Sequence, residues 1–250
     1  ESMVYQSQRQ QWQSTSKITH NKSFKSDSQC LAASFRSSIA KRRSHLNAAL
    51  AGKRKLRLMW TEKSLIEGQY VALEPLTLDH VPALIEAVKD GEHWKLWFAN
   101  VPSPEKMHCY VSDAITQMLL GNIAYAVRDR VTNKIVGSTR YYGVDDSNKR
   151  ALIGYTWYAN SARGTLINTE CKYLLLKQLF ERYEAIAVEF RTHVCNTASR
   201  KAIERLGANQ DGILRNHQIL KDGSVRDTVV YSIIDSEWSE IKQGLLKKLC

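Results

Sequence analysis

The stretch from Leu152 to Gly207 constrains the fold more than any other part of this chain. It predicts, in order, a strand, a short loop containing Arg163 and Gly164, a helix, a second strand and a second, short helix. The alternation of apolar and polar residues from Ala185 to His193 is typical of a half-buried strand. Two strands joined by a crossover helix favour an α/β fold built on a mixed sheet.

The loop before the first of these helices has the features of an anion-binding site. The helix is expected to run from about Ile167 to Arg182, beginning soon after Arg163 and Gly164. Free backbone N–H groups and the positive end of the helix dipole favour negative charge at such a terminus. The second helix has a good N-cap in Asn196 and a C-terminal stop in Gly207.

Four short motifs stand in this stretch: Ile153-Gly154-Tyr155 with Trp157, Arg163-Gly164-Thr165, Asn196 to Ser199, and Leu206-Gly207. In this order they resemble the acyl-CoA-binding core of the GNAT superfamily of N-acetyltransferases, and most closely its RimJ/RimL-like branch of ribosomal-protein acetyltransferases. The resemblance covers about residues 68–240. It implies a GNAT-like fold, a central mixed, mostly antiparallel sheet flanked by helices, and the use of acetyl-CoA as co-substrate without a metal.

The resemblance also implies a set of cofactor contacts. Backbone groups of Trp157 and Tyr158 would bind the pantetheine arm in a gap between the two strands, and Asn196 would bind it from the far side. The pyrophosphate would lie on the loop formed by Arg163, Gly164, Thr165, Leu166, Ile167 and Asn168. Leu166 and Asn168 depart from the small residues usual in family loops, so we expect weaker cofactor binding.

For catalysis, the resemblance implies that Ser199 donates a proton to the departing thiolate. Gln218 stands where RimL-like enzymes have a glutamate, and an amide cannot accept the proton of the amine. The final hairpin is expected from Ile213 to Leu220 and from Val225 to Ile234. A two-residue turn at Asp222-Gly223 would pair Leu214 with Tyr231, and Gln218 with Asp227 on one face, which makes Asp227 the first choice of general base. His217 is the second choice, although it should face the other side of the sheet, and water is the third.

Acceptor contacts are predicted at Trp94, Gln218 and Tyr231. Trp94 belongs to an aromatic loop that ends at Phe98. One interpretation makes this loop a wall of the acceptor pocket, and the other makes its rings a plug between helices.

Ten of the eleven net positive charges fall before residue 64. Residues 1–65 are rich in Ser, Gln, Lys and Arg, which predicts a basic, largely disordered tail. The tail is either an arm that binds RNA, a solvated segment, or, before Met59, sequence foreign to the native protein. Residues 66–240 are predicted to form the GNAT-like domain, and residues 241–250 a C-terminal helical extension.

The chain has five widely spaced cysteines, which we interpret as reduced thiols without a metal. Cys195 lies next to the proposed site, but the sequence places no base for it. No apolar run approaches the length of a membrane span, so we expect a soluble, cytoplasmic protein that contacts no membrane. Nucleic acid is expected as a partner only of the tail, and a homodimer is compatible with the resemblance.

The expected function is acetyl transfer from acetyl-CoA to a primary amine, most simply the α-amine of a protein N-terminus. A small amine, such as a polyamine or an amine antibiotic, is the alternative acceptor. A non-catalytic acyl-CoA-binding module is the alternative from another class, and Leu166 and Gln218 favour it.

Overall fold

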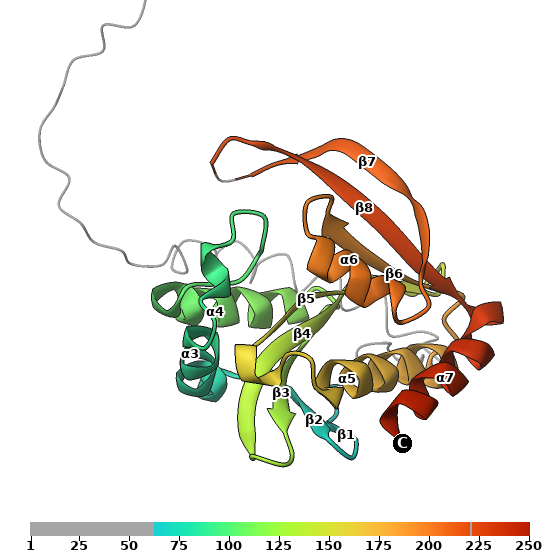
Figure 1. The fold of residues 1–250 in the computed structure, drawn as a ribbon, viewed down its shortest axis with the longest axis horizontal. Helices are drawn as coiled ribbons and strands as arrows, with labels where there is room; N and C mark the ends of the chain where they lie inside the picture. The colour runs from blue at the N-terminus through green and yellow to red at the C-terminus, as the bar shows by residue number, and fades with distance from the viewer. Residues whose placement is uncertain (1–62, 221) are drawn as a thin grey trace, which may run out of the picture. The chain divides into compact units, whose positions relative to one another are not determined.

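The computed structural model describes residues 63–220 and 222–250, which form a sheet with helices on both faces (Figure 1). The strands are β1 (Ile66–Glu67), β2 (Val71–Pro75), β3 (Ile123–Asp129), β4 (Lys134–Asp145), β5 (Arg150–Tyr158), β6 (Ala187–His193), β7 (Asn209–Ile219) and β8 (Val225–Ile234). The α-helices are α3 (Val81–Lys89), α4 (Met107–Met118), α5 (Leu166–Lys177), α6 (Thr197–Glu204) and α7 (Asp235–Leu249).

The strands lie in the order β1-β2-β3-β4-β5-β6-β8-β7. Neighbouring strands are antiparallel throughout the described residues except for β5 and β6, which run parallel. The α5 helix is the crossover that a parallel pair requires. The predicted fold class, a mixed and mostly antiparallel sheet flanked by helices, is therefore confirmed.

The helices cover the two faces of the sheet separately (Figure 1). Adjacent residues of β4 show this, because side chains alternate between faces along a strand. The Tyr141 hydroxyl donates a hydrogen bond of 2.8 Å to the Leu175 carbonyl oxygen of α5. The Arg140 guanidinium instead lies 4.2 Å from the ring centre of Tyr110 on α4. We call these two sides the α5 face and the α4 face.

Glu170 on α5 fixes the start of β2. Its carboxylate accepts hydrogen bonds from the backbone N–H groups of Gln69, Tyr70 and Val71 at 2.7, 2.6 and 2.7 Å. The residue is only 5% exposed, and these three donors replace the water that its charge would otherwise need. A Cβ atom at Gly68 would lie 2.5 Å from Cδ of the carboxylate, so a larger residue there would displace Glu170 from these donors.

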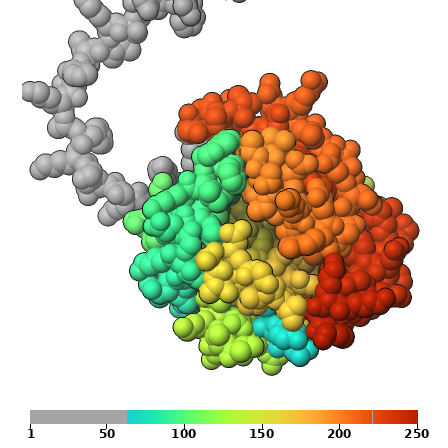
Figure 2. Space-filling model, viewed as in Figure 1, coloured from blue at the N-terminus to red at the C-terminus, as the bar shows by residue number. Residues whose placement is uncertain are grey.

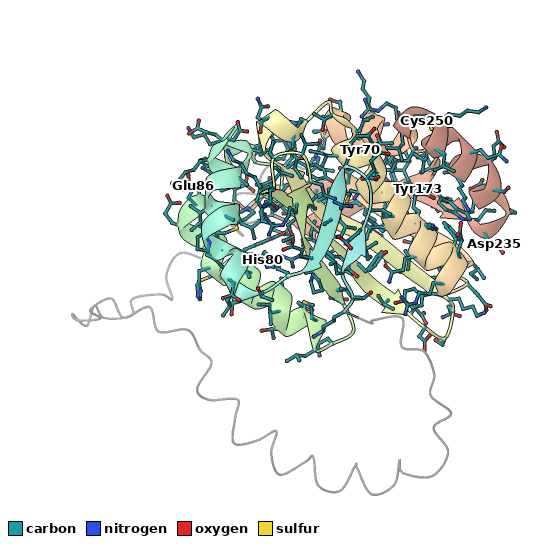
Figure 3. The ribbon with its side chains drawn as sticks, turned by 90° about the horizontal axis from the view of Figure 1, so that it is seen from below. Tyr70, His80, Glu86, Tyr173, Asp235 and Cys250 are labelled. Atoms are coloured by element: carbon teal, nitrogen blue, oxygen red, sulfur yellow. The ribbon has the colours of Figure 1, made fainter. Side chains whose placement is uncertain are left out.

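The last helix belongs to the packed domain. It begins at Asp235, so the expected boundary between domain and extension, after residue 240, falls inside α7. The Trp238 ring stacks on Phe180 with 5.3 Å between ring centres. At the other end, the Tyr70 hydroxyl donates to the Leu249 carbonyl oxygen at 3.3 Å, and Figure 3 shows Tyr70 near the C-terminal end of the helix.

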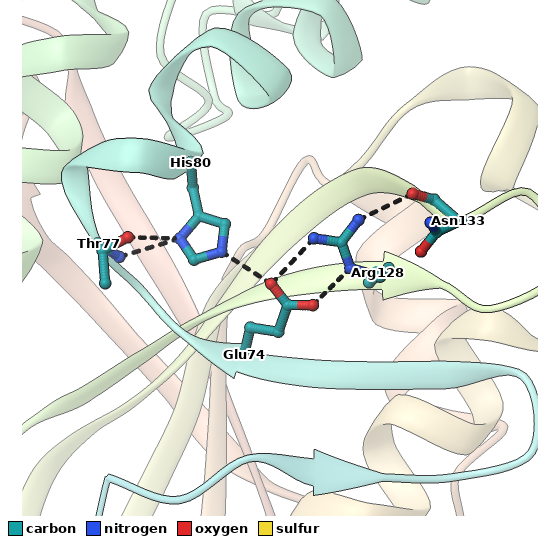
Figure 4. A network of polar contacts seen from close by, with 5 residues as sticks. All are labelled: Glu74, Thr77, His80, Arg128 and Asn133. Carbon is teal, nitrogen blue, oxygen red and sulfur yellow. Dashed lines mark hydrogen bonds and ion pairs between the residues drawn. The ribbon is translucent and has the colours of Figure 1, made fainter.

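A polar network joins β2, β3 and the turn before α3 (Figure 4). The Glu74 carboxylate is ion-paired with Arg128 and accepts a hydrogen bond of 2.9 Å from Nε2–H of His80. The Nδ1 atom of His80 accepts the Thr77 N–H at 3.0 Å, which sets the ring tautomer. The hydrogen bond from Arg128 is the main cause that lowers the pKa of Glu74.

Most predicted elements agree with the structure, and three differ. The predicted helix from 167 to 182 is α5 followed by a π-helical turn, Gln178–Arg182. The short edge strand β1 was not predicted. The strand predicted to begin at Ile213 begins at Asn209.

The predicted disordered tail lies outside the described residues up to residue 62. In the part of the chain that the structure describes, no helix is both long enough and apolar enough to cross a membrane.

Candidate active site

The central feature of the site is a gap between β5 and β6. The two strands pair only from Arg150 to Leu152 and from Ala187 to Glu189. Beyond these residues β5 stays paired with β4 on its other side, up to Tyr158 with Gly137. The edge of β5 from Ile153 onward therefore faces open space, and the predicted parting of the strands is confirmed.

A cavity of about 910 Å³ occupies this gap, which is the size of a pocket for a small molecule or cofactor. Figure 2 looks onto a hollow bordered by the yellow segment before α5 and the orange α6. Trp157 and Tyr158 line the cavity and are 5% and 9% exposed. Their side chains are largely packed into the core. A ligand at the open edge of β5 would therefore meet their backbone N–H and C=O groups.

The loop before α5 lines one end of the cavity. Gly164 has a φ of +75°, a conformation that glycine adopts without strain, and a Cβ atom there would meet no atom within 4 Å. Thr165 is the N-cap, because its hydroxyl accepts the Ile167 N–H at 3.3 Å and donates to the Ala162 carbonyl at 2.7 Å. The helix thus begins at Leu166, one residue before the predicted start.

Five of the six predicted loop residues line the cavity, and Ile167 does not. Ile167 is 7% exposed and packs in the core, so only its backbone is on the loop side. Leu166 lines the cavity and is half-buried. The Arg163 guanidinium lies 3.2 Å from Nε2 of His93, whose pKa is lowered by burial and by that positive charge.

The start of α6 lines the same cavity from the other strand. Asn196 caps the helix, and its Oδ1 atom accepts the Ser199 N–H at 3.0 Å. Asn196, Ser199 and Cys195 all line the cavity. The predicted N-cap is confirmed, whereas a contact of Asn196 with cofactor and a proton-donor role of Ser199 stay predictions.

The predicted acceptor contacts do not all reach the cavity. Gln218 lines it, but Trp94 and Tyr231 do not. Trp94 is half-buried against the core, and from its loop Phe98 lines the cavity instead. Tyr231 is fully buried, and its hydroxyl donates to Glu204 at 2.8 Å and accepts from Nε of Arg200 at 3.1 Å. Tyr231 therefore serves packing under α6.

The predicted register of the last hairpin is wrong. Gln218 pairs with Arg226 rather than with Asp227, and Tyr231 pairs with Gln210 rather than with Leu214. The pairing shifts between Leu214 and Gln218, where residues 215–217 form a bulge. The change begins at the turn, where the Leu220 N–H donates to the Ser224 carbonyl oxygen at 2.8 Å, so the strands close one residue earlier than a two-residue turn at Asp222-Gly223 would place them. The bulge then shifts the pairing further along β7 and changes which side chains share a face.

The observed register places His217 at the cavity and Asp227 away from it, the reverse of what was expected. Asp227 does not line the cavity, and its carboxylate accepts the Asn216 N–H at 2.7 Å. His217 lines the cavity beside Gln218, although it was expected on the other face. Its Nδ1 atom lies 3.0 Å from the Thr228 hydroxyl, which also accepts Nε–H of Arg226 at 3.0 Å.

Three buried titratable residues that line the cavity were not predicted: Lys172, His193 and Arg226, which are 6%, 3% and 7% exposed. Burial lowers the pKa of all three, that of Lys172 to about 8. The Nδ1 atom of His193 accepts the Cys195 N–H at 3.0 Å, so in the neutral ring the proton is on Nε2, which has no partner among the described residues. Nothing in the sequence pattern distinguishes these residues from exposed ones.

Residues 71–209, more than half of the chain, match the family model of an acetyltransferase (GNAT) domain. The chain belongs to the GNAT family of acetyltransferases. The family resemblance drawn from the four motifs is therefore confirmed, and the gap between β5 and β6 lies within the matched residues.

Individual relatives agree with this assignment. The protein named "Putative ribosomal N-acetyltransferase YdaF" of Bacillus subtilis (strain 168) is 32% identical over 104 residues, which are 42% of this chain and 56% of that protein. The chain thus spans only a little more than half the length of this curated relative. The similarity supports the RimJ/RimL-like branch of the GNAT family.

Two solved structures are also similar to this chain in three-dimensional fold. A GCN5-related N-acetyltransferase from Brucella melitensis matches with a TM-score of 0.69 and 27% identity, over 76% of this chain and 86% of that one. RimL, a ribosomal L7/L12 alpha-N-protein acetyltransferase, matches with a TM-score of 0.61 and 23% identity, over 68% of this chain and 94% of that one. At the latter identity the likeness concerns the fold.

Proposed function

We propose that this GNAT domain transfers the acetyl group of acetyl-CoA to a primary amine, and that the amine is the α-amino group of a protein N-terminus. The observation that carries the proposal is the cavity in the gap between β5 and β6. It joins the N-terminus of α5, the start of α6 and the β7–β8 hairpin in one space. A donor and an acceptor bound at its two ends would meet beside Ser199.

The α5 end has the chemistry that a pyrophosphate needs. The first-turn N–H groups of a helix have no intrahelical partner, and Thr165 takes up only that of Ile167. Arg163 adds a positive charge, and Gly164 leaves open space above the loop. Leu166 lines this space without closing it, so the residues present fit the phosphates of coenzyme A.

Bound acetyl-CoA would supply a thioester, whose C–S bond breaks as the amine nitrogen bonds to the carbonyl carbon. Ser199 donates its hydroxyl proton to the departing sulfur. The Asn196 side chain, through the Ser199 N–H, holds the residue in the first turn of α6. The residue that caps the helix therefore also positions Ser199.

The proton of the amine must go to a base, and no Asp or Glu among the described residues lines the cavity. His217 is the base in this proposal, with water as the alternative. In the tautomer whose Nδ1–H donates to the Thr228 hydroxyl, Nε2 is free to accept a proton. Gln218 beside it contributes hydrogen bonds to the acceptor.

A protein N-terminus is favoured over a polyamine on two grounds. YdaF, the relative with 32% identity, is named as a ribosomal N-acetyltransferase. A polyamine carries several positive charges and needs carboxylates around it, which the described lining of the cavity does not provide.

The test is release of free thiol from acetyl-CoA, measured with purified protein and a panel of acceptors. The panel contains short peptides with free N-termini, the same peptides with blocked N-termini, polyamines and amine antibiotics. Turnover with free peptides alone supports the proposal. Turnover only with small amines contradicts the assigned acceptor, and tight binding of acetyl-CoA without any turnover indicates a non-catalytic module.

A further inference from the structure

The cavity has a marked imbalance of charge. Among the described residues its lining contains no Asp or Glu but seven positively charged side chains, those of Arg163, Lys172, Arg191, Lys201, Arg205, Arg226 and Lys248. A phosphate-bearing donor accounts for positive charge at the α5 end. It does not account for positive charge on the opposite face of the sheet.

Arg226 lies on that opposite face. It interacts electrostatically with Tyr142 and Tyr155, whose rings meet edge to face at 5.1 Å. The Arg140 guanidinium stacks on both Tyr155 and Tyr110, which places this group on the α4 face. The α5 face is marked instead by Thr156, whose hydroxyl accepts from Lys172 at 2.7 Å.

The charge of Arg226 is not balanced by any described neighbour. The side chain is 7% exposed and forms no ion pair with a described carboxylate. Asp227, next to it in sequence, points away and accepts the Asn216 N–H. Arg191 is the other arginine near Tyr142, and its own charge is paired with Glu189 at 3.0 Å.

Two titratable neighbours, Tyr142 and His193, supply no negative charge near pH 7. Burial raises the pKa of Tyr142 to about 12, so its hydroxyl stays protonated. Burial and then the charge of Arg226 lower the pKa of His193, which keeps that ring neutral. A buried guanidinium without a counter-ion is costly, and a ligand anion would offset that cost.

We infer that Arg226 is a specificity residue for the acceptor, and that it binds the carboxylate of an acidic side chain close to the N-terminal amine of the acceptor protein. The inference rests on the proposed function and names its substrate class. Nε of Arg226 is held by Thr228 at 3.0 Å, so the two terminal nitrogens are the ones available to a carboxylate. The same Thr228 contacts His217, which places the anion site beside the proposed base.

The experiment compares pairs of short peptides that differ only by Glu against Gln at the second or third residue. We expect the wild-type protein to acetylate the Glu peptide with a kcat/KM about tenfold above that of the Gln peptide, as charge-assisted pairs allow. In Arg226→Gln the ratio between the two peptides should fall to about one, and in Arg226→Lys it should be partly kept. Equal rates in the wild-type protein, or a preference that survives in Arg226→Gln, overturn the inference.

Arg215→Gln is the matched control, because it removes the same charge from the same hairpin at a residue that does not line the cavity. Its peptide ratio should equal that of the wild-type protein. Binding of both peptides with coenzyme A present is measured in parallel, so that the preference is readable even without turnover. Equal affinities then overturn the inference, whereas selective binding without turnover contradicts only the proposed transfer.

The last comparison measures the acetylation of free serine and of free glutamate under the same conditions. If either is acetylated faster than the Glu peptide, the carboxylate belongs to a small molecule and the assignment to a protein side chain is wrong. Slow or absent acetylation of both supports it.

Discussion

The Nζ atom of Lys172 lies 2.7 Å from the Thr156 hydroxyl oxygen, so a buried amine of α5 is fastened to the strand that borders the gap. The second partner is the Thr139 hydroxyl at 3.3 Å on β4. Neither partner carries a charge. The cost of burying the positive charge is therefore not offset by a negative partner, and burial lowers the pKa of Lys172 to about 8 from an ordinary value of 10.5.

The first prediction concerns pH. Because the unfolded chain holds this proton up to about pH 10.5 and the folded chain only up to about 8, the contribution of Lys172 to stability rises with pH between these values and is lowest below pH 8. Lys172→Met should therefore raise the free energy of unfolding at pH 7 by about 2 kcal/mol. The two threonine hydroxyls, 2.8 Å apart, keep each other as partners.

Urea unfolding of both proteins between pH 7 and pH 10.5 measures this difference. The gain of the variant should shrink toward zero as the pH rises. A variant that is less stable than the wild-type protein at pH 7 would show that the hydrogen bonds of Lys172 outweigh the cost of its charge.

The second prediction concerns Glu170, whose carboxylate accepts three backbone N–H groups at the start of β2. Glu170→Ala leaves these donors without a partner and should cost about 3 kcal/mol of stability. Glu170→Gln keeps one acceptor and should cost less. Glu86→Ala is the control, since the Glu86 side chain is 73% exposed and its pair with Lys89 contributes little. Thermal unfolding would contradict this account if both alanine variants melted alike.

The third prediction separates chemistry from binding at α6. Ser199→Ala should lower kcat about 100-fold, as loss of a general acid does, while the affinity for coenzyme A measured by calorimetry stays the same. Cys195→Ala changes a residue that lines the same cavity and should keep kcat. Loss of activity in the cysteine variant instead would point to a nucleophilic thiol and a covalent step.

The fourth prediction decides between the two candidate bases on the hairpin. His217→Gln should reduce kcat/KM about 10- to 100-fold, whereas Asp227→Asn, which points away from the cavity and keeps an acceptor for the Asn216 N–H, should change it less than about twofold. The rates are compared with a free peptide across pH 6 to 9. If neither variant is impaired, water accepts the proton.

Local signals in the sequence were sufficient for the frame of this site. Asn196 caps α6 through a short-range hydrogen bond, as predicted, and the position of the gap follows from motifs that lie on β5 and its neighbours. The hairpin was a different case. Its strands close at Leu220 and Ser224 instead of around a two-residue turn, and the bulge at 215–217 has no clear sequence signal. The face on which His217 and Asp227 lie could therefore not be derived from the turn residues.

The environment of single side chains was also beyond the sequence. Lys172 follows the buried Cys171, and a helical period does not tell a buried lysine from one at the edge of the apolar stripe. Trp94 and Tyr231 illustrate the opposite error, because aromatic residues near a site are as useful for filling a core as for binding a ligand.

The gap between β5 and β6 separates the part of the sheet that carries the loop before α5 from the part that carries the β7–β8 hairpin. The match to the family model ends at residue 209, where β7 begins, so the hairpin that carries Gln218 and Arg226 lies beyond it. In the proposed function the acetyl donor binds along β5 and the N-terminus of α5, and the acceptor binds at the hairpin. The β5 and β6 strands between them pair only from Arg150 to Leu152 and from Ala187 to Glu189. Substitutions in the hairpin can therefore change acceptor specificity while the residues of β5 and α5 proposed to bind the donor stay the same.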